Sequence, residues 1–199
     1  DLVVNSSKEL LAEKAETNAE VMSGWLEEQS RIVMTMENAI VAMDPADKEG
    51  IMDYLGANLS ENESALMYYL CLGYNGGVFP ADHGSLDLDP STRDWWTSAV
   101  SAGELIYTEP YMDFASGQMI VSIADPFMFN GEQAVVLADI TLDQLLSMTG
   151  QISTDDGISS FLLAGDGSVI LHENEEYLPN EEGNTILTEH VKIDLTDGA

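Results

Sequence analysis

Basic side chains are scarce in this 199-residue chain. It contains 6 Lys and Arg residues against 36 Asp and Glu residues, which gives a formal net charge of −30 at pH 7. Nucleic acids and anionic membrane surfaces are also negatively charged, so repulsion disfavours both as partners. We interpret most of the acidic residues as solvated surface, where excess Asp and Glu keep a protein soluble.

Cysteine is nearly absent, because Cys71 is the only one. A single cysteine excludes an intramolecular disulfide and a thiolate metal cage, and the apolar residues around it favour a buried side chain. The three histidines (His83, His172 and His190) lack the spacing of a zinc site, and the HExxH motif is missing. Glycine loops of the phosphate-binding type are missing too. No metal, cofactor or catalytic residue is therefore expected.

Long hydrophobic runs are also missing. No stretch approaches the roughly 18 apolar residues of a membrane-spanning helix, and no signal-peptide pattern is present. The chain begins at Asp1 without a methionine, so we interpret it as an excised part of a longer protein. What is present is 45% hydrophobic and 21% charged, the composition of a folded protein with room for one large or two small domains.

A long amphipathic helix is predicted over residues 6–43. Apolar residues recur at three-and-four spacing from Met22 to Met43, residues 6–9 fit a capping box, and Asp44-Pro45 provides a stop. Such a helix greatly exceeds the usual length of about 11 residues, so it needs a partner along its length. That partner is either a domain of the same chain or a second copy, and we favour a homodimer contact through this helix.

An α+β fold is predicted for the remainder, with antiparallel sheets and flanking helices. The first module is expected to contain two helices, at residues 46–59 and 92–102, and five strands. Four strands are predicted at 65–72, 105–107, 118–124 and 134–140, and the fifth follows the first across an Asn-Gly turn within residues 73–80. Asn130-Gly131-Glu132 is predicted as the turn between the last two strands. A further short helix is expected at 141–148. A similar pattern restarts near Ile152 with a hairpin around residues 165–167. The predicted domains are the long helix (1–43), a first PAS-like module (44–150) and a second, small or truncated module (151–199).

A polar binding site is predicted within residues 89–139. The candidate ligand-binding residues are Arg93, Trp95, Trp96, Tyr111, Asp113 and Asp139. A guanidinium holds a carboxylate through two parallel hydrogen bonds, each contributing about 1.5–3 kcal/mol. Two opposing carboxylates suit an ammonium group, and an indole adds a cation–π contact. The set predicts a pocket for a zwitterion. A structural alternative stays open, in which Arg93 pairs with Asp89, Asp94 or Asp113 and both indoles lie in the core.

Four motifs in this region, taken in order, resemble the double Cache (dCache) family of extracellular bacterial sensor domains. They are Asp-Pro-x-x-Arg-x-Trp-Trp at 89–96, Tyr-Thr-Glu-Pro-Tyr-Met-Asp at 107–113, Met-Ile-Val-Ser-Ile-Ala at 119–124 and Val-Leu-Ala-Asp-Ile-Thr-Leu-Asp-Gln-Leu at 136–145. The resemblance implies a long helix beside two PAS-like modules, of which the membrane-distal one binds a small ligand. It also implies a place between two membrane spans of a chemoreceptor, a sensor kinase or a cyclic-dinucleotide enzyme.

The resemblance assigns a role to each matched residue. Arg93 and Trp95 would hold a ligand carboxylate, while Tyr111, Asp113 and Asp139 would surround an amino group. The implied ligand is a small polar metabolite, an amino acid or a related amine or carboxylate. The implied location is the cell membrane, with this domain on the extracellular or periplasmic side.

Two positions depart from the family pattern. Trp96 stands where the family commonly has Tyr, and Leu88 stands where amino-acid binders usually carry a Tyr that touches the ligand. The Leu88 difference leaves another amine, a carboxylate or a nucleobase open as the ligand. Two other functions also remain open. One is a sugar-acting hydrolase or carbohydrate-binding domain that uses paired carboxylates and tryptophans, and the other is a ligand-free module that only transmits contacts.

Overall fold

The computed structural model describes residues 2–73, 76–113, 115–141, 144, 162–163 and 169–171. The chain divides into two compact units, one of residues 1–27 and 142–199, the other of residues 28–141. The sheet and every predicted ligand-binding residue belong to the second unit. Most of the predicted second module (151–199) and of the predicted helix at 141–148 lies outside the described residues.

The first helix, α1 (Leu2–Val41), is continuous over 40 residues. It ends two residues before its predicted end, and its predicted start at residue 6 is wrong because the helix already begins at Leu2. Val33, Met36 and Ile40 are fully buried at the expected three-and-four spacing. α2 (Lys48–Glu61) follows, and the Asp47 side chain caps it by accepting a hydrogen bond of 2.9 Å from the Gly50 amide.

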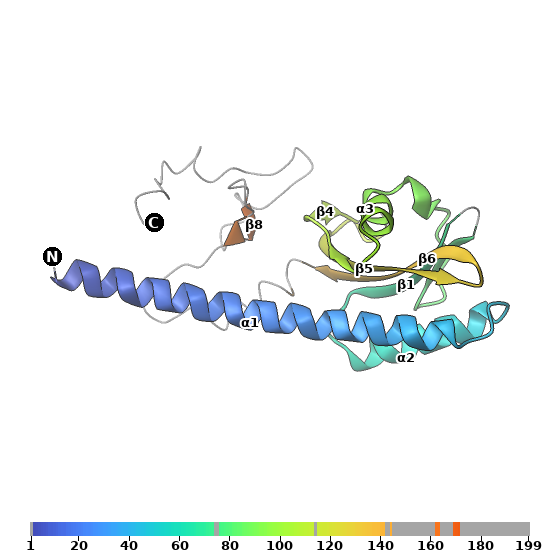
Figure 1. Ribbon diagram of the computed structural model, residues 1–199, viewed down its shortest axis with the longest axis horizontal. Coiled ribbons are helices and arrows are strands. Elements are labelled where there is room, and N and C mark those ends of the chain that lie inside the picture. Colours follow the sequence, from blue (N-terminus) through green and yellow to red (C-terminus); the bar gives the residue numbers. More distant parts are fainter. Residues whose placement is uncertain are drawn as a thin grey trace. The chain divides into compact units, whose positions relative to one another are not determined.

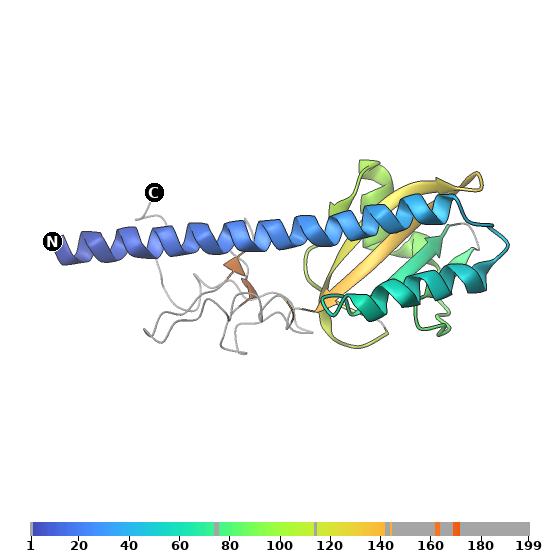
Figure 2. The ribbon, with the colours of Figure 1, turned by 90° about the horizontal axis from the view of Figure 1, so that it is seen from below.

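One antiparallel sheet forms the centre of the unit of residues 28–141. Its strands are β1 (Met67–Leu72), β2 (Gly77–Pro80), β3 (Ile106–Tyr107), β4 (Tyr111–Met112), β5 (Met119–Phe129) and β6 (Glu132–Thr141). The order is β2-β1-β6-β5-β3, and β4 also pairs with β5. Within this unit α1 and α2 lie side by side on one face of the sheet, and α3 (Asp94–Ala102) covers the other (Figures 1 and 2). The predicted α+β architecture is confirmed.

Tight turns hold the strands in register. Asn130 and Gly131 both adopt positive φ angles, 51° and 81°, so the β5–β6 hairpin closes in the way that its Asn-Gly pair predicted. This turn keeps β5 paired with β6 as far as Phe129, five residues beyond the predicted strand end at 124. In the other unit, β7 (Leu162–Leu163) and β8 (Val169–Leu171) pair antiparallel at the position of the predicted second hairpin.

Alternate residues of each strand face opposite sides of the sheet. Tyr69 and Cys71 on β1 belong to a buried cluster with the two tryptophans of α3, so the residues between them face α1 and α2. On β6 the same alternation directs Leu137 and Asp139 toward α3. Ser122 on β5 is the register partner of Asp139 and shares its face. This face of the sheet therefore carries the predicted aspartate.

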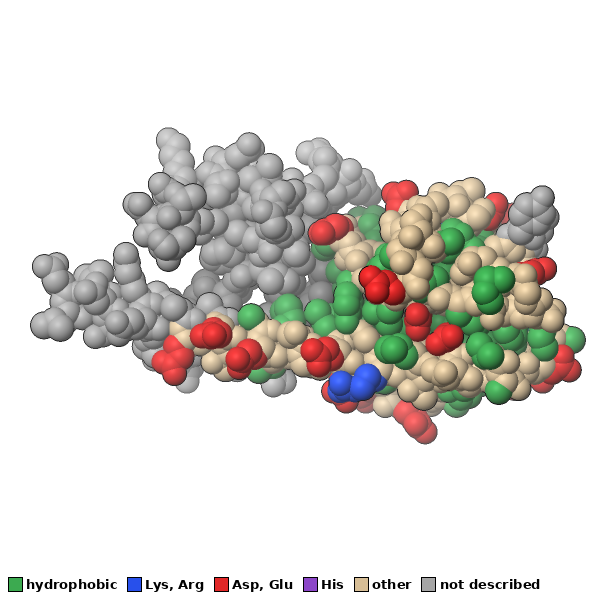
Figure 3. Space-filling model, viewed as in Figure 1, with side chains coloured by type: hydrophobic (Ala, Val, Ile, Leu, Met, Phe, Trp, Pro, Cys, Tyr) green, Lys and Arg blue, Asp and Glu red, His purple; other side chains and the backbone are tan. Residues whose placement is uncertain are grey.

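Acidic side chains are dispersed over the face drawn in Figure 3 and do not gather in one patch. That distribution fits the interpretation of the negative charge as solvated surface. Among the described residues, no helix is both long enough and apolar enough to cross a membrane.

Candidate ligand-binding site

A cavity lies between α3 and the strands of the sheet. Its empty volume, including the part open to solvent, is about 380 Å³. Twelve residues line it: Tyr69, Cys71, Val78, Leu86, Leu88, Arg93, Trp95, Tyr111, Asp113, Ala115, Leu137 and Asp139. Five of the six predicted ligand-binding residues are in this lining, although they come from separate segments of the chain. Trp96 is not.

Arg93 lies at the junction of two helices. It is the C-cap of the short 3₁₀ helix η1 (Pro90–Thr92) and the N-cap of α3, with an extended backbone at φ −96° and ψ 143°. The neighbouring Asp89 carboxylate instead accepts the Ser91 amide at 2.9 Å. Within the described part of the chain the Arg93 guanidinium makes no hydrogen bond or ion pair. The structural alternative, a pair with Asp89, Asp94 or Asp113, is therefore not formed among these residues.

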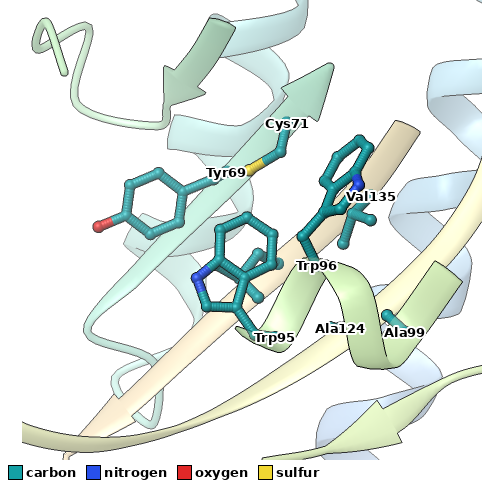
Figure 4. Packing of buried hydrophobic residues seen from close by; sticks show 8 residues of the cluster. Tyr69, Cys71, Trp95, Trp96, Ala99, Ala124 and Val135 are labelled. Carbon is teal, nitrogen blue, oxygen red and sulfur yellow. The ribbon is translucent and has the colours of Figure 1, made fainter. Parts of the chain in front are cut away.

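The two neighbouring tryptophans of α3 have different surroundings. Both are 6% exposed, and their rings meet edge to face with centroids 6.2 Å apart. Trp95 lines the cavity, whereas Trp96 packs so closely on Gly73 that a Cβ at residue 73 would come within 2.8 Å of the indole. Figure 4 shows both rings with the buried cluster, which includes Cys71 and Val135. The structure thus gives Trp96 a packing role.

Asp139 is buried at the polar end of the cavity, with 2% of its surface exposed. Ser122 Oγ donates a hydrogen bond of 2.5 Å to Asp139 Oδ1, and the Tyr111 hydroxyl lies 2.7 Å from the same Oγ. Burial raises the pKa of Asp139 to about 7; the nearby Asp113 charge adds to this rise, and hydrogen bonds from Ser122 and Tyr69 oppose it. The charged form of this carboxylate is therefore poorly stabilised without a cation.

Asp113 is the second buried carboxylate of the cavity, with 9% of its surface exposed. Its Oδ2 accepts a hydrogen bond of 2.7 Å from the Ser116 amide. Burial, followed by the charge of Asp139, raises the pKa values of the Tyr69 and Tyr111 phenols, so both hydroxyls remain protonated and can donate. Two carboxylates and two phenols thus form an electron-rich end that suits an ammonium group.

Sequence reasoning missed two residues of the candidate site: Tyr69, which lines the cavity, and Ser122, which hydrogen-bonds to Asp139. Ser122 interrupts an otherwise apolar strand, and that polar interruption was a usable signal. Tyr69 lies in an aromatic and aliphatic run, where nothing separates a cavity residue from a core residue. Only the register of β1, β6 and β5, which pairs Tyr69 with Leu137 and Ser122 with Asp139, brings them to the site.

A second, larger cavity adjoins the first. Its empty volume is about 1200 Å³, again including space open to solvent. Arg93, Trp95 and Tyr111 belong to both linings, so the two cavities meet at these side chains. The larger cavity also carries the acidic residues Asp94 and Glu109. The described residues contain no group of three or more His, Cys, Asp or Glu side chains placed to hold a metal ion.

Residues 26–147 match the family model of the methyl-accepting chemotaxis protein-like, first PDC sensor domain. The chain belongs to this family. The match spans the sheet, α2, α3 and all the cavity residues. It confirms that the resemblance to Cache sensor domains, on which the four sequence motifs agreed, was correct.

Whole receptors are among the relatives of this PDC sensor domain. It is 28% identical over 156 residues to the methyl-accepting chemotaxis protein PscA of Pseudomonas syringae pv. tomato, covering 76% of this chain and 24% of that protein. It is 31% identical over 166 residues to McpA of Pseudomonas putida, covering 79% and 25%. The chain therefore spans about a quarter of the length of these relatives.

Solved ligand-binding domains of chemoreceptors share the fold. The domain of CtaA from Pseudomonas fluorescens, in complex with L-serine, superposes with a TM-score of 0.74 at 25% identity, covering 87% of this chain and 75% of that one. The domain of the amino acid chemoreceptor PctB from Pseudomonas aeruginosa, in complex with L-Arg, gives 0.72 at 26% identity, covering 87% and 74%. The domain of PctC, in complex with GABA, gives 0.77 at 24% identity, covering 92% and 82%.

Proposed function

We propose that this PDC sensor domain binds a small zwitterion, an amino acid or a related amine or carboxylate, as the extracellular or periplasmic part of a transmembrane chemoreceptor. The observation that carries the proposal is the composition of the first cavity. A guanidinium without a partner among the described residues and two buried carboxylates line the same small space. A ligand with one carboxylate and one ammonium group complements both poles.

The basic and acidic residues of the cavity bind opposite ends of the ligand. The Arg93 guanidinium binds the ligand carboxylate, and the Trp95 ring forms a wall beside it. Asp113 and Asp139 accept hydrogen bonds from the ammonium group. Charge-assisted bonds of this kind contribute about 1.5–3 kcal/mol each, and the ammonium also relieves the cost of an ionised Asp139.

The named relatives support this choice. CtaA, PctB and PctC are described with L-serine, L-Arg and GABA, each of which carries an amino and a carboxylate group. The named relatives are chemotaxis proteins, so a non-enzymatic sensor is favoured over the sugar-acting hydrolase. A homodimer through α1 remains a prediction. Signalling requires that the ligand bind one arrangement of the receptor more tightly than another, since a ligand shifts a population only by that difference.

A thermal-shift and calorimetric screen tests the proposal. Amino acids, GABA, simple amines and simple carboxylates are titrated into the domain, and a zwitterion is expected to raise the melting temperature progressively with its concentration. Arg93→Ala should weaken binding by roughly 10- to 150-fold. Arg31→Ala, which removes an exposed guanidinium on α1, is the matched control and should change nothing. Failure of every amine and carboxylate to bind, or unchanged affinity in Arg93→Ala, would contradict the proposal.

A further inference from the structure

Part of the lining of the first cavity is apolar. It consists of Cys71, Val78, Leu86, Leu88 and Leu137. Leu137 is 4% exposed and Cys71 is fully buried, so this wall belongs to the protein core. The burial that surrounds the Cys71 thiol raises its pKa, so it remains a neutral, weakly polar group there.

Strand register places the apolar residues of the lining relative to Asp139. On β6, Leu137 lies two residues before Asp139 and faces the same side of the sheet. Cys71 on β1 pairs with Val135, four residues along β6 from Asp139, and also with Val78 on β2. At about 3.3 Å per residue, four residues span roughly 13 Å. A bridge from Val78 to Leu86 extends the apolar wall into the following loop.

In the proposed function, every charged residue of the cavity lining binds either the carboxylate or the ammonium group of the ligand. These residues are Arg93, Asp113 and Asp139. A charged ligand side chain placed against the apolar wall would lose its hydration without gaining a partner, which is costly. An aliphatic side chain of the ligand would instead gain from every methylene removed from water.

We propose that the apolar wall is the side-chain subsite and that the domain selects L-amino acids with aliphatic side chains, such as valine and leucine. This inference rests on the proposed function. Leu88 is its specificity-determining residue, because its half-buried side chain lines the cavity from a loop outside the sheet. The opposite arrangement would direct the ligand side chain into the second cavity, where Asp94 and Glu109 would favour a basic group.

The first experiment compares ligands on the unaltered domain by titration calorimetry. The dissociation constant is expected to fall by about fourfold for each methylene added from L-alanine through L-2-aminobutyrate to L-valine. L-Aspartate, L-glutamate, L-lysine and L-arginine should bind at least tenfold more weakly than L-valine. Tighter binding of L-lysine or L-arginine would overturn the aliphatic subsite and leave the proposed function standing. Absence of binding by every amino acid would remove both.

The second experiment locates the contact. Leu88→Ala should weaken binding of L-leucine by about an order of magnitude, in line with the loss of several buried methylene contacts, and should leave binding of L-alanine within about twofold. Met112→Ala is the matched control, since Met112 is exposed and lines only the second cavity. Equal loss for L-leucine and L-alanine in Leu88→Ala would overturn the assignment. Leu86→Ala repeats the test from the neighbouring position if Leu88→Ala lowers the melting temperature.

Discussion

The two faces of the central sheet use neighbouring residues of the same strands for different purposes. On the face toward α1 and α2, Leu70, Val136 and Ile140 are fully buried aliphatic residues. On the face toward α3, Ser122 and Asp139 are equally inaccessible but polar. The first face stabilises the fold through close apolar packing. The second carries the polar groups of the proposed ligand-binding site, which contribute less apolar packing.

Each face also holds a buried aspartate, and the two differ in surroundings. Asp139 lines the cavity and accepts a hydrogen bond from Ser122. Asp125 faces α1, and burial followed by the charge of Glu37 raises its pKa to about 6. A buried carboxylate is therefore not sufficient to identify the site. What marks Asp139 is the enclosed space beside it and the arginine in the same lining.

The largest expected effect is on stability and comes from the face toward α1 and α2. Leu70→Ala should lower the free energy of unfolding by about 2–5 kcal/mol, because it leaves a cavity among fully buried side chains. The dissociation constant of the folded domain should change little, since the side chain does not line the site. Urea denaturation and titration calorimetry at low temperature measure the two quantities.

The neighbouring residue Tyr69 provides the matched change on the other face. Tyr69→Phe removes a cavity-lining hydroxyl that lowers the pKa of Asp139 and keeps the aromatic ring. It should weaken ligand binding more than Leu70→Ala does, with a smaller loss of stability. If Leu70→Ala weakened binding at least as much as Tyr69→Phe, the division of labour between the faces would be wrong.

The second prediction concerns the cost of the buried charge at Asp139. Its pKa of about 7 in the folded state lies above the ordinary value of 3.8, so between these values the folded state binds more protons than the unfolded state. Stability of the ligand-free domain therefore falls as the pH rises from about 4 to about 7, by up to about 4 kcal/mol from this group. Asp139→Asn should be more stable than the unaltered domain at pH 8, and this advantage should vanish toward pH 4.

Denaturation at several pH values measures this prediction. Asp125→Asn is the control on the other face, and its smaller advantage should begin to shrink only below about pH 6, the raised pKa of Asp125, and should also vanish toward pH 4. Asp139→Asn should at the same time lose affinity for an amino acid, because the amide carries no charge for the ammonium group. Lower stability of Asp139→Asn at pH 8 would mean that the buried carboxylate is stabilised by its surroundings and is not strained by them.

Local patterns in the sequence were sufficient for most of the architecture. The three-and-four spacing of α1 and the Asn130-Gly131 turn act over a few residues, and each predicted its element. The start of α1 could not be located, because a capping box four residues into a helix looks the same as one at its beginning. The long pairing of β5 with β6 depends on their mutual register, which no local pattern records.

The site was predictable to the extent that its residues carry unusual chemistry. Arg93 and Trp95 stood out among acidic neighbours, and both line the cavity. Trp95 and Trp96 could not be separated from the sequence, because the rotation of α3 about its axis decides which indole faces the cavity. Ser122 became part of the site only through its pairing with Asp139 across two strands.

A smaller effect is expected at Ser122. Ser122→Ala removes the hydrogen bonds to Asp139 and Tyr111 and should lower the free energy of unfolding by about 1–3 kcal/mol. Because the Ser122 hydrogen bond holds the pKa of Asp139 down, its loss should raise that pKa further. Carbon-detected NMR titration of the Asp139 carboxyl measures the shift. Ser116→Ala, at an exposed position on the loop beside Asp113, should leave the pKa of Asp139 unchanged.

The smallest effect is expected where an edge strand connects the site to α1. The Tyr107 hydroxyl lies 2.5 Å from Ser30 Oγ on α1, and the next residue, Thr108, accepts the Ser122 amide at 2.8 Å. Tyr107→Phe removes the first hydrogen bond and keeps the ring, so it should cost about 0.5–1.5 kcal/mol of stability.

A double-mutant cycle with Ser30→Ala separates this contact from the further interaction that Ser30 makes. A coupling energy near 1 kcal/mol, with faster amide exchange in α1 around residue 30 for Tyr107→Phe, would show that β3 and α1 are held together by this bond. The polar face then has a direct covalent and hydrogen-bonded route, through Thr108 and Tyr107, to the helix that packs on the apolar face. A coupling energy of zero would leave the two faces connected only through the core of the sheet.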